Sequence, residues 1–241
     1  MLKYFCTLFI SILTATAVWA QPVKQATVLF NIGISLRDHG MNNDAIASFK
    51  KAIKLNKKYD SAYLEMAMLY LKISQTDSAV LTLNTAVKVN PDFAVGYSTL
   101  GNIYRDYKRN MDSAILSYSS ALKLDSTQKT TLYGLAWCNN QKENYREAVN
   151  YAIKALEIDN NYKPAYNELG HAYRQLKAYQ ECIDQFKKNL AISVNELPLL
   201  YSGYCYMELN QKENALKIYE ELNKLNPKMA GALKKKLDEM K

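Results

Sequence analysis

The chain has 241 residues, and 31 lysine and arginine residues against 23 aspartate and glutamate residues give a net charge of +8. Half of the residues are hydrophobic, which excludes a wholly disordered chain. Eight glycines and five prolines are too few for a collagen-like sequence and disfavour an all-β fold with many tight turns. The two histidines cannot form a multi-histidine metal centre. Composition therefore predicts a folded, helix-rich protein that is poor in catalytic side chains.

Residues 1–20 have the pattern of a signal peptide. A basic start at Lys3 is followed by an uncharged, mostly apolar stretch that ends in small residues, Val18 and Ala20, at the places that signal peptidase accepts. The stretch is shorter than the roughly 20 residues that span a bilayer. We expect cleavage after Ala20 and export to the periplasm, the outer membrane or the medium of a bacterial cell, without a membrane span in the mature chain. A retained signal anchor is the alternative.

After a short leader at residues 21–25, small residues recur at intervals of 33 to 35 residues. One recurring set is Ala45, Ala79, Ala114, Ala148, Cys182 and Ala215, and a second is Gly33, Ala67, Gly101, Ala136, Gly170 and Gly203. Neighbouring large residues follow at helical spacing, so each unit predicts two helices that cross closely at their small residues. One such hairpin cannot bury both of its apolar faces, and stacked neighbours can.

The spacing defines six units and a final helix. The units are 26–59, 60–93, 94–128, 129–162, 163–195 and 196–229, and the third holds one extra residue near residues 108–110. Positions in a unit are counted below from its first residue, so the two small residues stand at positions 8 and 20. Residues 230–241 predict a capping helix, because Ala230, Leu233, Leu237 and Met240 share one face. Its lysine-rich opposite face suits an exposed solenoid end, and gripping a membrane is the alternative.

The pattern resembles the tetratricopeptide repeat (TPR) family. Leu169-Gly170, Tyr173 and Phe186 stand at the family's positions 7–8, 11 and 24, and Asn90-Pro91 closes the second unit as the family does. The resemblance implies an all-α fold, a right-handed superhelical solenoid of antiparallel helix pairs with a C-terminal capping helix. It also implies a protein-binding scaffold whose first helices line a concave groove.

The family's groove positions carry amides, cations and aromatic rings in the middle units. By this resemblance, the residues expected to bind a partner are Asn102, Arg105, Tyr133, Trp137, Asn140, Asn167, His171, Arg174 and Tyr204. Amides can pair with the backbone of a peptide, and arginines favour an acidic group. The lysines of the chaperone-type carboxylate clamp are missing. Alternatively, these polar groups simply face water, and the aromatic residues pack in the core.

The three cysteines outside the signal segment are Cys138, Cys182 and Cys205. Cys182 and Cys205 are the pair that could form a disulfide, because they lie at similar heights on adjacent antiparallel helices. We expect buried free thiols instead.

Three classes of function are compatible with this sequence. We expect a non-catalytic scaffold or adaptor of the cell envelope that binds a peptide or helix of another protein, with no cofactor, metal or nucleic acid, and self-association is a possible use. A cell-wall glycan-binding module, using Tyr133 and Trp137, is the second reading. The third reading is an accessory subunit of an envelope enzyme. A second chain would have to complete the active site, because this sequence has no nucleophile–base pair and no phosphate-binding motif.

Overall fold

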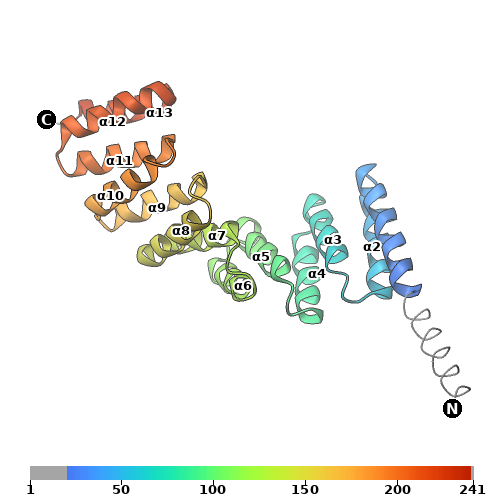
Figure 1. Ribbon diagram of the computed structural model, residues 1–241. Coiled ribbons are helices and arrows are strands. Elements are labelled where there is room, and N and C mark those ends of the chain that lie inside the picture. Colours follow the sequence, from blue (N-terminus) through green and yellow to red (C-terminus); the bar gives the residue numbers. More distant parts are fainter. Residues whose placement is uncertain (1–20, 240–241) are drawn as a thin grey trace, which may run out of the picture. The chain divides into compact units, whose positions relative to one another are not determined.

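The computed structural model describes residues 21–239, so the predicted signal segment at 1–20 lies outside the described residues. Within that range the chain is entirely helical, with no strand, as the repeat pattern predicts. Residues 21–38 are helical, so the residues of the leader at 21–25 are continuous with the first helix. Figure 1 shows the helices following one another as hairpins.

Each hairpin consists of a first and a second helix. Residues 21–38 form the first helix of the first hairpin, and later first helices are α3 (Asp60–Lys72), α5 (Ala94–Ile103), α7 (Lys129–Gln141), α9 (Lys163–Gln175) and α11 (Glu196–Glu208). The second helices are α2 (Asn42–Leu55), α4 (Thr76–Val89), α6 (Met111–Leu124), α8 (Tyr145–Ile158), α10 (Tyr179–Leu190) and α12 (Lys212–Leu225). The final helix is α13 (Pro227–Asp238).

The small residues at position 20 pack as predicted. All six are fully buried, from Ala45 to Ala215. The large residue at position 24 covers the small residue at position 8 in the first hairpin, where a Cβ atom on Gly33 would overlap the ring of Phe49. Close helix crossing therefore explains why the sequence needs small residues at both positions.

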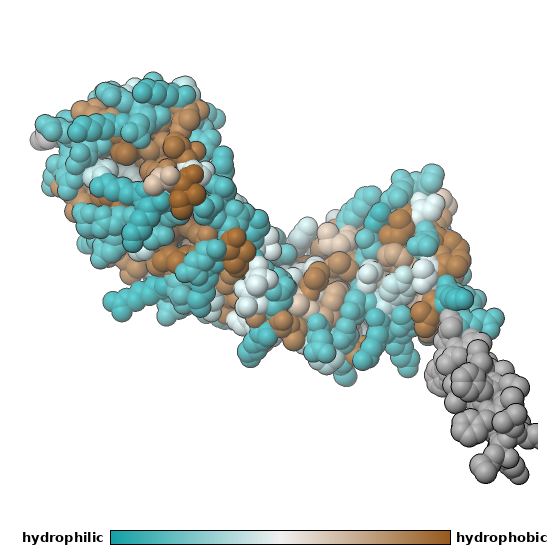
Figure 2. Space-filling model, in the orientation of Figure 1, coloured by the Kyte–Doolittle hydropathy of each residue, from teal (hydrophilic) through white to brown (hydrophobic). Residues whose placement is uncertain are grey.

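The described residues divide into two compact units, residues 21–103 and 104–239. In the N-terminal unit, the core includes residues of α2, α3 and α4, with Phe49, Tyr63 and Ala86 buried. In the C-terminal unit, a continuous core runs from α7 to α13 and includes Tyr166, Phe186 and Leu199. In Figure 2, apolar side chains are visible between hydrophilic ones on the surface of both units.

The turns between first and second helices share one backbone conformation and one closing hydrogen bond. One residue in each of these turns takes a left-handed conformation. It is Gly40 in the first turn, and in the others it is a residue other than glycine: Ser74, Arg109, Glu143, Lys177 and Asn210. The next amide then donates a hydrogen bond to a carbonyl five residues earlier, as from Gln75 to Tyr70. This bond closes the first helix and aims the chain into the second.

The extra residue of the third unit is absorbed before its turn. A π-helical turn, η1 (Tyr104–Lys108), follows α5, and the closing bond from Asn110 reaches back six residues to Tyr104 instead of five. A wider helical turn accommodates one inserted residue without disturbing the next helix. The insertion therefore lies between Tyr104 and Asn110, and it places Arg105 on the wide turn.

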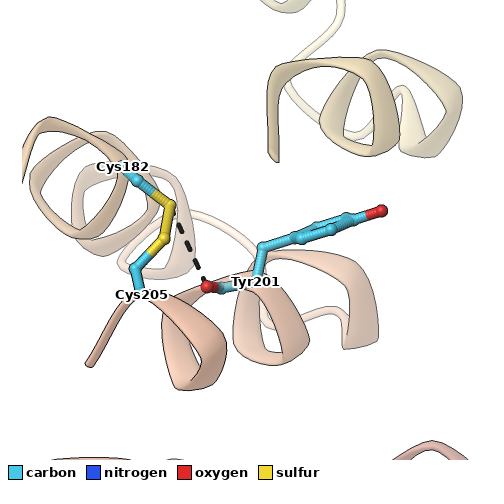
Figure 3. Close-up of a disulfide and its surroundings, with 3 residues drawn as sticks. All are labelled: Cys182, Tyr201 and Cys205. Atoms are coloured by element: carbon cyan, nitrogen blue, oxygen red, sulfur yellow. Dashed lines mark hydrogen bonds between the residues drawn. A yellow bond between two sulfur atoms is a disulfide. The ribbon is translucent and has the colours of Figure 1, made fainter. Parts of the chain in front are cut away.

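The prediction of free thiols at Cys182 and Cys205 is wrong. The two residues form a disulfide between α10 and α11, with Cα atoms 6.7 Å apart (Figure 3). The two helices are adjacent and antiparallel, and this separation is within the range that a disulfide spans. Cys138 is a free, buried cysteine.

The final helix begins at Pro227, three residues before the predicted start at residue 230. Asn226 caps it directly, because its side chain accepts a hydrogen bond from the Met229 amide, and proline is well suited to the first turn. Ala230, Leu233 and Leu237 are buried, as the spacing predicts. Met240 lies outside the described residues.

Candidate binding face on the first helices

The predicted partner-binding residues stand at positions 5, 9 and 12 of successive first helices, and with position 6 these define what we call the first-helix face. Side chains at position 12 reach across to the next first helix. Arg37 Nη1 lies 2.5 Å from Glu65 Oε2, and Asn140 Nδ2 donates to Glu168 Oε2 at 2.8 Å. The side chains of Arg37 and Asn140, at position 12, therefore connect neighbouring repeats within the protein.

Arg105 is enclosed by its own repeat and the next one. Its Nε and Nη2 atoms donate to the two carboxylate oxygens of Asp106 at 2.7 and 2.9 Å. The guanidinium carbon lies 5.6 Å from the ring centre of Tyr133 and 5.9 Å from that of Trp137. Only 15% of its side chain is exposed, and the hydrogen bond with Asp106 raises its pKa. The charge of Arg105 is therefore neutralised within the protein.

Asn140 is buried, whereas its position in the repeat predicted an exposed residue that binds a partner. Its amide nitrogen also donates to the Glu168 backbone carbonyl at 3.0 Å, while its Oδ1 atom has no hydrogen-bond partner. Glu168 is 5% exposed, and burial raises the pKa of its carboxyl, although the bond from Asn140 and the charge of Arg105 oppose that shift. The pair joins α7 to α9 below the surface.

Asn167 and Tyr201 form a second connection, between α9 and α11. The Tyr201 hydroxyl donates to Asn167 Oδ1 at 2.6 Å, and its ring stacks on Phe186 with centres 6.4 Å apart. The ring lies over the backbone of Gly170, where a Cβ atom would overlap it. In Figure 3 this ring points away from the disulfide, whose Cys182 sulfur lies 3.9 Å from the Tyr201 carbonyl oxygen.

Two cations flank Tyr204 on α11. The guanidinium carbon of Arg174 lies 5.0 Å from the ring centre of Tyr204, and Lys236 Nζ, from α13, lies 4.8 Å from it. His171 packs edge-on against Tyr145 with centres 6.0 Å apart. Burial, and then the charge of Arg174, lower the pKa of His171, so its ring is neutral at pH 7.

The structure thus brings the predicted residues of the C-terminal unit together as two groups. Arg105, Tyr133 and Trp137 form one, and Arg174 and Tyr204 form the other. Asn102 is exposed on α5 of the N-terminal unit. That unit has its own cavity of about 600 Å³ on the first-helix face, beside the Arg37–Glu65 ion pair.

Sequence reasoning missed two residues of this face, Glu168 and Tyr201, and one residue beside it, Lys236 on α13. The first two stand at position 6, where the N-terminal unit has Glu65 as the partner of Arg37. A polar residue at position 12 of one unit, followed by an acidic residue at position 6 of the next, could therefore have predicted a contact between the two first helices. Lys236 was one lysine among several on the final helix, and nothing in the spacing singled it out.

The described residues were compared with the requirements of metal binding, thiol chemistry and a membrane span. No group of three histidine, cysteine or acidic residues is arranged to hold a metal ion within residues 21–239. Burial raises the pKa of the Cys138 thiol to about 12, and Cys182 is in the disulfide. In the same range, no helix has the length and apolar character needed to cross a membrane.

The helix hairpins, buried small residues and connected first helices define a helical repeat scaffold. Models of the tetratricopeptide repeat match residues 36–103, 130–162, 164–193 and 199–228, together more than half of the chain. The chain belongs to the tetratricopeptide repeat family.

Similar proteins support the fold and differ in what they do. A Drosophila melanogaster protein O-mannosyl-transferase, Tmtc3, is 31% identical over 108 residues, 45% of this chain and 12% of that protein. The chain spans less than a third of the length of the curated relatives it matches.

Two solved structures have the same fold over most of the chain. PilW, a type IV pilus biogenesis factor, has a TM-score of 0.62 at 17% identity, covering 86% of this chain and 97% of its own. YrrB, a TPR protein with an unusual peptide-binding site, has a TM-score of 0.57 at 17% identity, covering 91% and 97%. At these identities the likeness shows the fold alone.

Proposed function

We propose that this protein is a non-catalytic scaffold of the cell envelope that binds a peptide or helix of another protein on its first-helix face. The observation that carries the proposal is the varied chemistry of that face, where aromatic rings, cations and amides from successive first helices lie side by side. Peptide binding by YrrB and the role of PilW in pilus biogenesis, as their titles state them, are consistent with such a use.

The export part of the proposal rests on two observations. Residues 1–20 have the signal-peptide pattern, and a disulfide between Cys182 and Cys205 suits an oxidising compartment. Sequencing the amino terminus of the protein purified from its native cells tests the first point. A mature chain that begins at Gln21 is expected, and a chain that retains residues 1–20 in the cytoplasm would contradict export.

A glycan-binding module is less well supported than a protein scaffold. A sugar ring would have to stack on Tyr133 or Trp137, and Arg105 already lies over a face of each ring. A sugar ring would have to displace the Arg105 guanidinium from these two aromatic faces. We therefore take a protein as the partner.

Photo-crosslinking in the native cells tests the scaffold. A benzoylphenylalanine residue is placed at Asn167, which is exposed on the first-helix face, and for comparison at Lys217, which is exposed on the second helix α12. A discrete protein crosslinked from Asn167 and absent from Lys217 is the expected result. Crosslinks from Lys217 alone, or no protein crosslink from either site, would overturn the proposal.

A further inference from the structure

The end of the first-helix face nearest α13 carries two positive charges around one ring. Tyr204 stands on α11, which packs between α9 and α13, and each neighbour contributes one cation. Arg174 lies 5.0 Å and Lys236 4.8 Å from the centre of the Tyr204 ring. We call these three residues the Tyr204 cation site. A ring attracts a cation through its negative face, but it does not neutralise the charge.

Several basic side chains of the described chain are paired with carboxylates, whereas Arg174 and Lys236 are not. Arg105 binds Asp106, Lys129 binds Asp159 and Lys163 binds Glu196. Within residues 21–239, no carboxylate forms an ion pair with Arg174 or Lys236. Asp238, two residues after Lys236 in the sequence, pairs with Lys234, and Glu208, four residues after Tyr204, interacts with the Tyr179 hydroxyl.

The site is open to a partner. Lys236 is exposed, and Arg174 and Tyr204 are partly exposed. Tyr201 contributes a further aromatic surface, with its ring centre 6.5 Å from that of Tyr204. An arginine offers a planar fork of donors that matches a carboxylate, and a lysine adds a second positive charge.

We propose that the Tyr204 cation site binds a carboxylate side chain of an acidic peptide segment in the partner protein. This inference rests on the proposed scaffold function and adds the chemistry of the partner. It assigns recognition to Arg174 and Lys236 and denies it to Arg105, whose charge is already compensated. Charge complementarity is the argument, because two cations without a carboxylate partner among the described residues converge on one partly exposed ring.

Fluorescence anisotropy with labelled peptides tests this assignment directly. The probes are a short oligoglutamate peptide and an oligoglutamine peptide of equal length. We expect the purified protein to bind the glutamate peptide, and the double variant Arg174→Glu/Lys236→Glu to bind it about tenfold more weakly or worse. The matched control is Lys188→Glu/Lys217→Glu, which makes the same change in net charge at exposed residues of α10 and α12.

Four outcomes would overturn the inference. They are no binding of the glutamate peptide by the wild-type protein, equal binding of the glutamine peptide, an equal loss in the control variant, and tighter binding of a polyuronate chain than of the glutamate peptide. Circular dichroism shows whether the variants remain folded. If the double variant unfolds, Arg174→Gln/Lys236→Gln replaces it, and the same loss is expected.

The crosslinking experiment separates this inference from the scaffold itself. If the crosslink from Asn167 persists unchanged in the folded double variant, the scaffold stands and the acidic-peptide assignment is wrong. If the wild-type protein gives no partner crosslink at all, the scaffold is wrong. Loss of the crosslink in the double variant, with the control variant unaffected, supports both.

Discussion

Glu168 is an example of a residue on the first-helix face that stabilises the contact between two repeats. Its carboxylate is buried against the Asn140 amide, and α7 and α9 are joined by this bond. The Asn140 Oδ1 atom is left without a partner, so the pair is incompletely satisfied. A buried acid with an amide as its direct donor is costly to ionise.

We predict that Glu168→Gln changes how stability depends on pH. Burial raises the pKa of Glu168 above 4.5 in the folded state, so the folded protein holds the proton more tightly than the unfolded chain. The stabilising contribution of the protonated group is fully present below pH 4.5 and is lost as the pH rises through the raised pKa. Glutamine keeps an acceptor for Asn140 and cannot ionise.

Urea unfolding of both proteins across a pH series measures this effect. The free energy of unfolding of the variant minus that of the wild type should increase as the pH rises above 4.5 and then level off. Carboxyls with lowered pKa values, such as those of Asp159 and Glu196, are present in both proteins and cancel in the difference. A difference independent of pH would contradict the prediction.

Two glycines test the packing argument at single-residue level. Gly170→Ala should lower the free energy of unfolding by about 1–3 kcal/mol, because its Cβ atom overlaps the Tyr201 ring, which the bond to Asn167 holds in place. Gly231→Ala is the matched control, since nothing lies within 4 Å of the added atom and alanine favours a helix by about 1 kcal/mol. Thermal unfolding of both variants decides, and destabilisation by Gly231→Ala would be inconsistent with the open space around it.

At the scale of helices, the disulfide is a covalent link between two repeats. Cys182 takes the place of the alanine that other units have at position 20, so the bond replaces a small packing residue without adding bulk to the crossing. The two cysteines are 23 residues apart in the sequence. Closing a loop of this length in the unfolded chain is worth about 3 kcal/mol in the chain-entropy model.

We predict that Cys182→Ala/Cys205→Ala lowers the free energy of unfolding by about 3 kcal/mol. Alanine is the natural residue at position 20 and occurs at Cys205's position as Ala172, so packing is largely kept. Dithiothreitol should destabilise the wild-type protein by a similar amount and leave the double variant unchanged. A reducing agent that destabilises both proteins equally would show that the effect does not come from the disulfide.

The helix pairs could be predicted from the sequence, whereas the partners of the face residues could not. Position 20 is small in every unit because two helix axes cross there, and spacing alone reveals that requirement. Arg105 is different, because it contacts Tyr133 and Trp137 from the wide turn η1. The sequence spacing had predicted the extra residue in the loop near residues 108–110, and so it did not predict this turn. Spacing likewise brought Cys182 near Cys205 but did not give the direction of the sulfur atoms.

At the scale of the whole molecule, the chain consists of two compact units with separate cores. In a repeat protein, stability is roughly the sum of the repeats and their nearest-neighbour contacts, so parts of the array can open separately. Both cysteines of the disulfide, Cys182 and Cys205, belong to the C-terminal unit. It cannot oppose local opening of the N-terminal unit.

Native-state hydrogen exchange should therefore resolve two levels of protection. We expect amides in α2, α3 and α4 to exchange through openings of lower free energy than amides in α10 and α11. Reduction should weaken the protection of α10 and α11 by about a hundredfold, the equivalent of the lost loop constraint, and leave α2 to α4 unchanged. The Cys182→Ala/Cys205→Ala variant is the control that should not respond to the reducing agent. A single level of protection throughout, lowered everywhere by reduction, would instead mean that the two units unfold as one cooperative body.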